Sequence, residues 1–293
     1  MSTMSAYAFG TMSIGRDPSR IRHDISLARD AMEAGVSFHT SHRYSSVNNY
    51  NVLRRAFREA PDQVPPCICK IRCYNADTIR CDVEDTLLQL ELDTIHVAQL
   101  SRRSGESKKD VVEDFLSEGP MWEACMELRE AGLVGDYFLE LFVSCSREAV
   151  RAVEQNLFDG YAFYYSVVDR EVTNELARML REREEPIISI RTVGGGKIFP
   201  GAVDRMRREE PDHYYLDRIS DLEPIYERSE SRDWLDFALR FLLSQPNVCT
   251  TVGGTASKEH LEDFVESVAG VRPLPAELVE EIHGLHDEWM TGF

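Results

Sequence analysis

The sequence predicts a single (β/α)₈ barrel, in which eight parallel strands close into a cylinder covered by helices. Its length of 293 residues suits one such barrel. Short apolar runs alternate with amphipathic runs along most of the chain, which favours a parallel sheet with right-handed crossovers. The short runs are apolar on both sides, as expected for strands buried between a barrel core and a ring of helices.

The individual elements follow from hydrophobic periodicity. Residues 20–34 show helical spacing, with Ile21, Ile25, Ala28 and Met32 on one face and Gly35 after the last turn. The same signal predicts helices at residues 76–90, 111–131, 146–154, 171–183, 232–243 and 258–268. The runs expected to form strands begin near Tyr7, Val36, Pro66, Thr94, Tyr137, Gly160, Ile187 and Val248.

Two segments fall outside this alternation. Residues from about 201 to 231 are rich in charge and are predicted to form a long loop, either a lid over a site or a solvated excursion. A final helix is predicted at about 276–290, after Pro273 and Pro275. Because no linker interrupts the pattern, we expect residues 1–293 to form one domain.

Composition excludes several classes of partner. The formal net charge is −18 and the pI is about 4.9, so the surface repels phosphate backbones and nucleic acid is not an expected partner. No stretch approaches the ~18 apolar residues needed to cross a bilayer, and the start lacks the basic and apolar regions of a signal peptide. We therefore expect a cytoplasmic protein with a small-molecule substrate and no membrane partner; the sequence assigns no oligomeric state.

No metal site is predicted. The seven cysteines are an odd number in a large chain, which favours reduced thiols. Cys67 and Cys69 share a strand face opposite Lys70 and should point toward the helices, away from the barrel interior. His39 and His42 flank the end of the second strand without an identifiable third ligand.

Several segments resemble, in order, the motifs of the aldo-keto reductase family. Residues 31–44 (AMEAGVSFHTSHRY) resemble the signature A-x-x-x-G-h-x-x-F-D-T-A-x-x-Y, where h is hydrophobic. Residues 67–70 (CICK) resemble a third strand that ends in a catalytic lysine. Further similar segments are FGTM (9–12), LLQLELDTIHVAQLS (87–101), WEACMELREAG (122–132), residues 187–196 and residues 237–264. The resemblance spans residues 7–268 and implies the barrel fold.

The resemblance also implies a catalytic set of Tyr, Lys, Asp and His. Tyr44 takes the place of the general acid, and Lys70 that of the lysine that lowers its pKa. A phenol with a pKa near 10 is a poor acid at pH 7 unless a neighbouring cation stabilises the phenolate. His39 stands in place of the Asp and Ser101 in place of the His. We therefore expect Lys70 to lose its anionic partner and to tend toward neutrality.

The resemblance implies NADP as cofactor, although many family contacts are substituted. Ala162 and Ile190 replace the nicotinamide contacts, and Ala256 and Phe264 replace a phosphate-binding cation and an adenine-binding Asn. A glycine-rich turn and a helix N-terminus still offer backbone N–H groups to a pyrophosphate. The expected cofactor-binding residues are Arg191, Gly195, Gly196, Lys197, Gly254, Ser257, Lys258 and Asp263.

Three functions are compatible with these residues. The first is a divergent oxidoreductase that reduces a small carbonyl substrate with NADPH, using Tyr44 and Lys70. The second is a non-redox acid–base enzyme, of the dehydratase or cyclase type, using Tyr44, His39 and His42. The third is a redox-dead ligand-binding or regulatory protein, because fold alone does not determine function.

Overall fold

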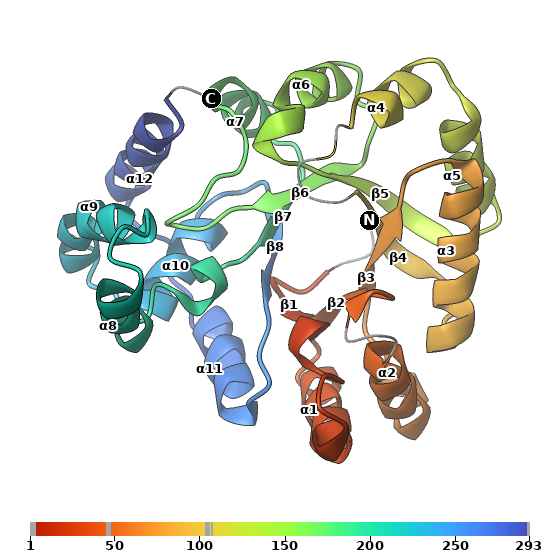
Figure 1. Cartoon of the computed structure of the whole chain (residues 1–293), viewed down its shortest axis with the longest axis horizontal. Helices are drawn as coiled ribbons and strands as arrows, with labels where there is room; N and C mark the ends of the chain where they lie inside the picture. The colour runs from red at the N-terminus through yellow and green to blue at the C-terminus, as the bar shows by residue number, and fades with distance from the viewer. Residues whose placement is uncertain (1–3, 45–47, 103–105, 107, 292–293) are drawn as a thin grey trace.

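The predicted barrel is confirmed. In the computed structural model, which describes residues 4–44, 48–102, 106 and 108–291, eight parallel strands pair in sequence order, and β8 closes on β1 (Figure 1). The strands are β1 (Tyr7–Gly10), β2 (Ser37–Ser41), β3 (Cys67–Arg72), β4 (Ile95–Ser101), β5 (Val134–Glu140), β6 (Gly160–Tyr164), β7 (Ile187–Ile190) and β8 (Val248–Gly253).

The alternation of side chains along the strands separates two cores. An apolar cluster in the barrel interior contains one or two side chains from each of seven strands: Ala8, Ile68, Val97, Phe138, Ala162, Ile188, Ile190 and Val252. The alternate strand residues, among them Cys67 and Cys69, pack outward into the larger core under the helices. The predicted orientation of these two cysteines is therefore confirmed, and Lys70, between Cys69 and Ile71, has the inward parity of Ile68.

Twelve α-helices lie within the described part of the chain. They are α1 (Ile21–Glu33), α2 (Asn48–Glu59), α3 (Ala76–Leu90), α4 (Lys109–Leu116), α5 (Pro120–Glu130), α6 (Ser146–Glu154), α7 (Asn174–Glu182), α8 (Pro200–Glu209), α9 (Tyr215–Arg228), α10 (Trp234–Leu243), α11 (Lys258–Ala269) and α12 (Ala276–Trp289). The prediction of one helix over 111–131 was wrong, because Gly119 and Pro120 end α4 and begin α5. Helix α2 was not predicted.

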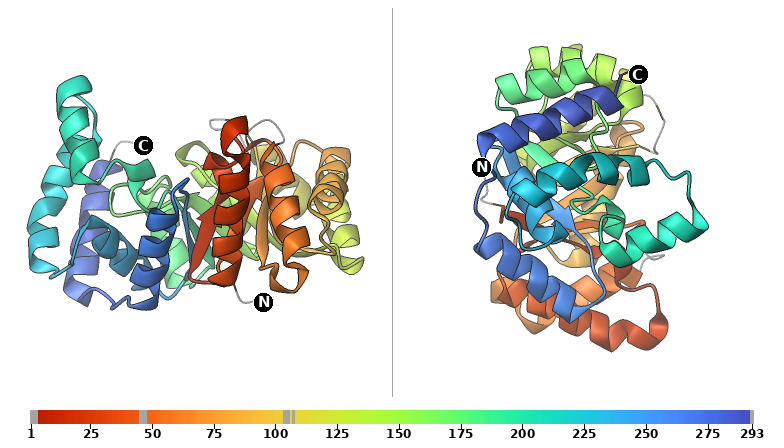
Figure 2. Two further views of the ribbon diagram at one scale, coloured as in Figure 1. Left: turned by 90° about the horizontal axis from the view of Figure 1, so that it is seen from below. Right: turned by 90° about the vertical axis from the view of Figure 1, so that its left-hand side faces the viewer.

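The prediction of a long loop over 201–231 was also wrong. This segment forms most of α8 and all of α9, which lie to one side of the barrel, with α8 standing clear of it (Figure 2). Val203 and Met206 are buried three positions apart on α8, and Ile219, Leu222 and Ile225 are buried three apart on α9. The helix predicted at about 276–290 is confirmed as α12.

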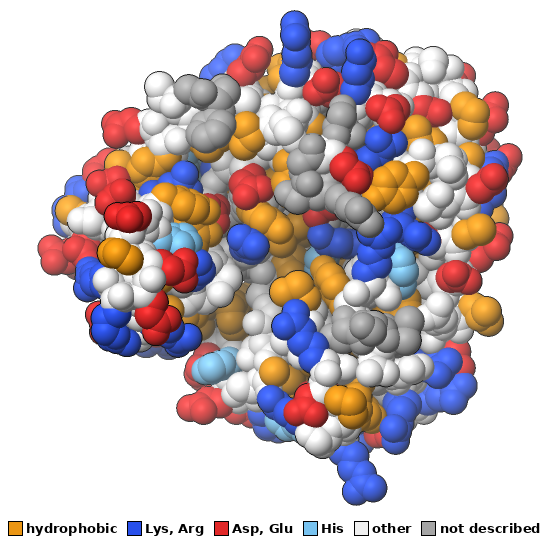
Figure 3. Space-filling view, viewed as in Figure 1, with side chains coloured by type: hydrophobic (Ala, Val, Ile, Leu, Met, Phe, Trp, Pro, Cys, Tyr) orange, Lys and Arg blue, Asp and Glu red, His pale blue; other side chains and the backbone are white. Residues whose placement is uncertain are grey.

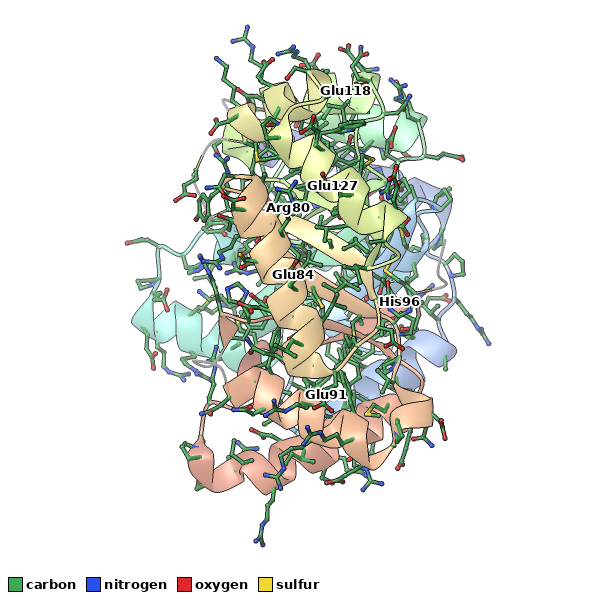
Figure 4. All side chains as sticks on the ribbon, turned by 90° about the vertical axis from the view of Figure 1, so that its right-hand side faces the viewer. Arg80, Glu84, Glu91, His96, Glu118 and Glu127 are labelled. Carbon is green, nitrogen blue, oxygen red and sulfur yellow. The ribbon has the colours of Figure 1, made fainter. Side chains whose placement is uncertain are left out.

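The outer helices carry exposed ion pairs. On the face formed by α3 and α5, Arg80 points toward Glu127, at 2.7 Å, and Glu91 lies at the far end of α3 (Figure 4). Such solvated pairs contribute little to stability. None of the helices in the described residues is long and apolar enough to cross a membrane.

Candidate active site

The polar side chains of the site lie at the carboxyl ends of consecutive strands. The register places His39 opposite Ile68, and Lys70 opposite Gln99, so these side chains share the inward face of the barrel. Glu140 on β5 has the inward parity of Phe138 and lies opposite Ala162 on β6. The fold therefore brings His39 and Lys70 together, as the resemblance implied. It also places beside them Gln99 and Glu140, two residues that the sequence analysis did not identify.

Lys70 has an anionic partner, and the expectation that it lacks one was wrong. Its Nζ lies 2.6 Å from Oε1 of Glu140, and the two side chains keep only 19% and 4% of their exposure. Burial by itself lowers the pKa of Lys70, but the carboxylate of Glu140, assisted by Tyr44, raises it well above its ordinary value. Lys70 is therefore charged at neutral pH.

His39 does not supply charge to this cluster. It is 2% exposed, and its Nε2 lies 2.9 Å from Oε1 of Gln99. Burial lowers the pKa of His39 to about 3, and the positive charge of Lys70 lowers it in the same direction. With Gln99 accepting through Oε1, Nε2 carries the hydrogen of a neutral ring. The negative charge beside Lys70 thus comes from β5 and not from β2.

Tyr44 and Ser101 complete the predicted set. Burial raises the pKa of the Tyr44 phenol, Lys70 lowers it, and Glu140 and Tyr164 raise it, so the phenol holds its proton at neutral pH. Tyr44 is half-buried. The hydroxyl of Ser101 lies 3.5 Å from the carbonyl oxygen of Ile71, too far for a strong hydrogen bond. Of the two, Tyr44 lines the cleft described below, whereas Ser101 is not among its lining residues.

A cleft of about 1490 Å³ begins at this cluster and runs outward along the insertion formed by α8 and α9. His39, Tyr44 and Ile190 line its inner end, and Thr255 and Asp263 line the part beside α11. Figure 3, which shares the view of Figure 1, shows a hollow near the centre of the molecule with hydrophobic side chains inside it and Lys or Arg side chains at its rim. The cleft exceeds the roughly 300–1,000 Å³ typical of sites for drug-sized ligands.

Six of the eight predicted cofactor residues line this cleft: Arg191, Gly195, Gly196, Lys197, Gly254 and Asp263. The other two have different surroundings and are not among its lining residues. The hydroxyl of Ser257 accepts a hydrogen bond from the backbone N–H of His260 and so caps α11. Nζ of Lys258 lies 3.0 Å from Oδ1 of Asp30, on the outer surface beside α1.

Comparison with known families settles the identity of the fold. The sequence matches the aldo/keto reductase family over residues 7–287. The chain belongs to this family. No curated protein matches its sequence.

Solved structures of similar fold agree with this assignment. An aldo-keto reductase of Bacillus halodurans in its holo form has a TM-score of 0.73 at 20% identity, over 97% of this chain and 95% of that one. An aldo/keto reductase of Klebsiella pneumoniae, in complex with NADP and acetate, has a TM-score of 0.70 at 15% identity, over 97% and 92%. At these identities the likeness concerns the fold alone.

The glycines of this family member shape the middle of the cleft. Gly194, Gly195 and Gly196 all have positive φ, at 57°, 67° and 85°, a conformation that L side chains rarely adopt. A Cβ at Gly195 or Gly196 would meet nothing within 4 Å, so the turn leaves open space beside its backbone. At Gly254 a Cβ would lie 2.8 Å from the carbonyl oxygen of Gly10. Here glycine permits the close approach of β1 to the loop after β8.

Phe264 shows how far the outer end of the cleft departs from the family pattern. The resemblance places it where the family has an adenine-binding Asn. Its ring instead stacks on Tyr7, with centroids 4.9 Å apart and an interplanar angle of 12°. The hydroxyl of Tyr7 in turn donates to the carbonyl oxygen of Gly253. This position has thus become part of the packing that holds the loop after β8.

Proposed function

We propose that this protein reduces a small carbonyl compound with NADPH, and that Tyr44 donates the proton. The observation that carries the proposal is the ion pair of Lys70 and Glu140, at 2.6 Å, whose charges act on the Tyr44 phenol. The substitution of Asp by His39 removes a carboxylate from β2, and Glu140 provides one from β5. The electrostatic function of the family's Lys–Asp pair therefore has a counterpart in this chain.

The three residues have separate tasks. Tyr44 holds its proton at neutral pH and gives it to the substrate oxygen as negative charge develops there. The ammonium of Lys70 stabilises the phenolate that remains. Glu140 keeps Lys70 charged in a site where burial favours the neutral amine. NADPH, when bound, supplies the hydride that the carbonyl carbon receives.

The residues of the cleft fit the phosphate part of the cofactor better than its nicotinamide. Lys197 follows Gly195 and Gly196, whose backbone borders open space, so a cation and unobstructed backbone lie together where a pyrophosphate would need them. In the structure Nζ of Lys197 lies 2.6 Å from Nε2 of His213, a neutral partner that an anion would supplement. At the inner end, Ile190 provides apolar surface but no donor or acceptor for a carboxamide, and Ala162 is fully buried and does not line the cleft. We therefore expect NADPH to bind with modest affinity through its phosphates.

The lack of a carboxamide partner at positions 162 and 190 favours a second candidate. A non-redox acid–base enzyme needs no nicotinamide contacts and would still use Tyr44 and Lys70. Such an enzyme turns over substrate in cofactor-free protein, whereas the proposed reductase does not. A redox-dead ligand-binding or regulatory protein would bind compounds in the cleft without turnover.

The test is NADPH oxidation with a broad panel of small aldehydes and ketones, using wild type, Tyr44→Phe and Tyr74→Phe. Tyr74 is an exposed tyrosine after β3 and serves as the matched control. We expect Tyr44→Phe to lose about 10²–10⁴-fold in kcat, the usual contribution of a positioned acid, and Tyr74→Phe to match wild type. Unchanged turnover in Tyr44→Phe would remove this phenol from the mechanism. No oxidation by wild type with any compound would contradict the reductase.

A further inference from the structure

Arg191 lies directly after β7, at the inner part of the cleft. The carbon of its guanidinium lies 4.2 Å from the centroid of the Tyr164 ring at the end of β6. Tyr164 is close enough to Lys70 and Tyr44 to raise the pKa of both. A group bound by Arg191 is therefore held beside the residues that we assign to proton transfer.

Arg191 has no ionic partner among the described residues, in contrast to several other cations around the barrel mouth. Within the described residues, no carboxylate oxygen lies within 4.0 Å of its guanidinium, although the side chain is exposed. Among the described residues that line the cleft, Arg205 lacks an ionic partner too, but it lies on α8, in the insertion and not beside the Tyr44 cluster. The neighbouring cations are paired: Lys70 with Glu140, Arg72 with Asp82, Arg102 with Asp110, and Arg218 with Asp169. Lys108 also lacks a hydrogen-bond partner for its ammonium, but it is fully buried and cannot reach a ligand in the cleft.

Two carboxyl groups, Asp169 and Glu171, exert an electrostatic effect on Arg191, but neither forms an ion pair with it. Asp169 accepts hydrogen bonds from the hydroxyl of Tyr215 and from Arg218. Burial, and then the charge of Asp169, raise the pKa of Glu171 to about 7. A carboxyl group whose pKa is raised in this way gives up its charge more readily, which weakens its competition for Arg191.

The backbone at Arg191 supports a functional role. Its φ is +63°, in the left-handed region that non-glycine residues adopt rarely. Such conformations gather at functional sites, where the position of one side chain outweighs the strain. Stacking on Tyr164 covers one face of the planar guanidinium and leaves its N–H edges available for two parallel bonds to one anion.

We propose that the substrate is an oxo acid, and that Arg191 binds its carboxylate while Tyr44 faces its carbonyl oxygen. This inference rests on the proposed carbonyl reduction. In that reaction the carbonyl carbon gains a hydride from NADPH, the carbonyl oxygen gains the proton of Tyr44, and the carboxylate is unchanged. A guanidinium matches a carboxylate in both charge and shape, which a single lysine does not.

The test compares ω-oxo carboxylates of two to six carbons with their methyl esters, because the ester keeps the carbonyl and removes the negative charge. NADPH oxidation is measured for wild type, Arg191→Gln, Arg191→Lys and Arg178→Gln. Arg178 pairs with Glu182 on the surface of α7 and controls for the loss of one positive charge. Calorimetric titration of the same acids into cofactor-free protein provides a readout independent of turnover, and circular dichroism checks folding.

We expect at least one acid to exceed its ester in kcat/KM by about tenfold or more, as for loss of a charge-assisted hydrogen bond. Arg191→Gln removes this preference and the binding of the acid, Arg191→Lys restores part of it, and Arg178→Gln matches wild type. Equal turnover of acid and ester, or an unchanged preference in Arg191→Gln, would overturn the role of Arg191 and leave the reductase standing.

Two further outcomes separate this inference from the proposed function. Binding of an oxo acid to wild type but not to Arg191→Gln, with no NADPH oxidation, would support the anion site and contradict carbonyl reduction. Absence of binding and of acid preference across the whole panel would overturn the anion site. The Arg191→Lys variant keeps the charge in place, so misfolding of Arg191→Gln does not prevent a decision.

Discussion

Replacement of Glu140 by Gln is expected to destabilise the protein strongly, because it leaves the buried Lys70 without a counter-charge. The glutamine keeps the volume and an oxygen acceptor, so the main change is the loss of one negative charge. Removing one partner of a buried ion pair lowers the free energy of unfolding by about 3–5 kcal/mol. Because the Lys70 side chain retains 19% of its exposure, we expect about 3 kcal/mol, at the lower end of this range.

The pH dependence of this loss identifies its cause. In the wild type the pKa of Lys70 lies above its ordinary value of 10.5, so its contribution to stability is fully present below pH 10.5 and is lost as the pH rises further. Without Glu140, burial holds the pKa of folded Lys70 below 10.5. The unfolded variant then binds more protons than the folded variant, and its stability rises with pH up to 10.5. The difference between wild type and variant should therefore narrow from pH 7 to pH 10.

The assay is urea unfolding at pH 7, 8.5 and 10, with Glu127→Gln as the matched control. Glu127 pairs with Arg80 at a similar distance, 2.7 Å, but on the solvated face of α3 and α5, so its loss should change stability little (Figure 4). The double variant Glu140→Gln/Lys70→Met should recover part of the stability lost by Glu140→Gln alone. A loss below about 0.5 kcal/mol at pH 7, or a loss independent of pH, would refute a charged Lys70 held by Glu140.

Two other expected outcomes concern His39 and Gly254, the glycine that follows β8. Burial lowers the pKa of His39 to about 3, so the unfolded chain binds up to one more proton than the folded chain below the ordinary pKa of 6.5, and stability falls with decreasing pH. From pH 6.5 to 5 this costs about 1.6 kcal/mol, and urea unfolding of His39→Gln should show a correspondingly smaller loss. An unchanged slope would contradict burial of a neutral ring. Gly254→Ala places a methyl group 2.8 Å from the carbonyl oxygen of Gly10 and should lower the free energy of unfolding by about 1–3 kcal/mol, measured by thermal unfolding. Gly201→Ala is the control, because a Cβ there meets nothing within 4 Å, and it should not destabilise the protein. Equal melting temperatures for the two variants would contradict the close contact at Gly254.

The barrel could be predicted because its strands leave a clear pattern of short apolar runs between amphipathic helices. The segment at 201–231 could not, because charged residues surround the few apolar positions, such as Val203 and Ile219, that decide its two helices. The break at Pro120 was missed although the pair of Gly119 and Pro120 is a local signal for a helix end followed by a helix start.

At the site, motif spacing could place Tyr44 and Lys70, but it could not show what surrounds them. Glu140 was missed because the fifth strand has no clean family motif, so no position drew attention to it. A signal was present: Glu140 is an acidic residue at the end of an apolar run, two positions after Phe138, and so has the parity of the barrel interior. Because position 39 carries His in place of the family's Asp, the inward carboxylate at the end of the fifth strand is the residue type that Lys70 requires.

The most direct test of the account is calorimetric titration of NADPH into the purified protein, with NADH as the comparison nucleotide. Lys197→Gln and Lys258→Gln form a matched pair, because Lys197 lines the cleft and Lys258 pairs with Asp30 outside it. We predict saturable NADPH binding with a Kd of about 1–100 µM, weakened by Lys197→Gln and unchanged by Lys258→Gln. Absence of binding at about 1 mM NADPH would contradict an NADPH-linked reductase and move the chemistry of Tyr44, Lys70 and Glu140 to a reaction without this cofactor.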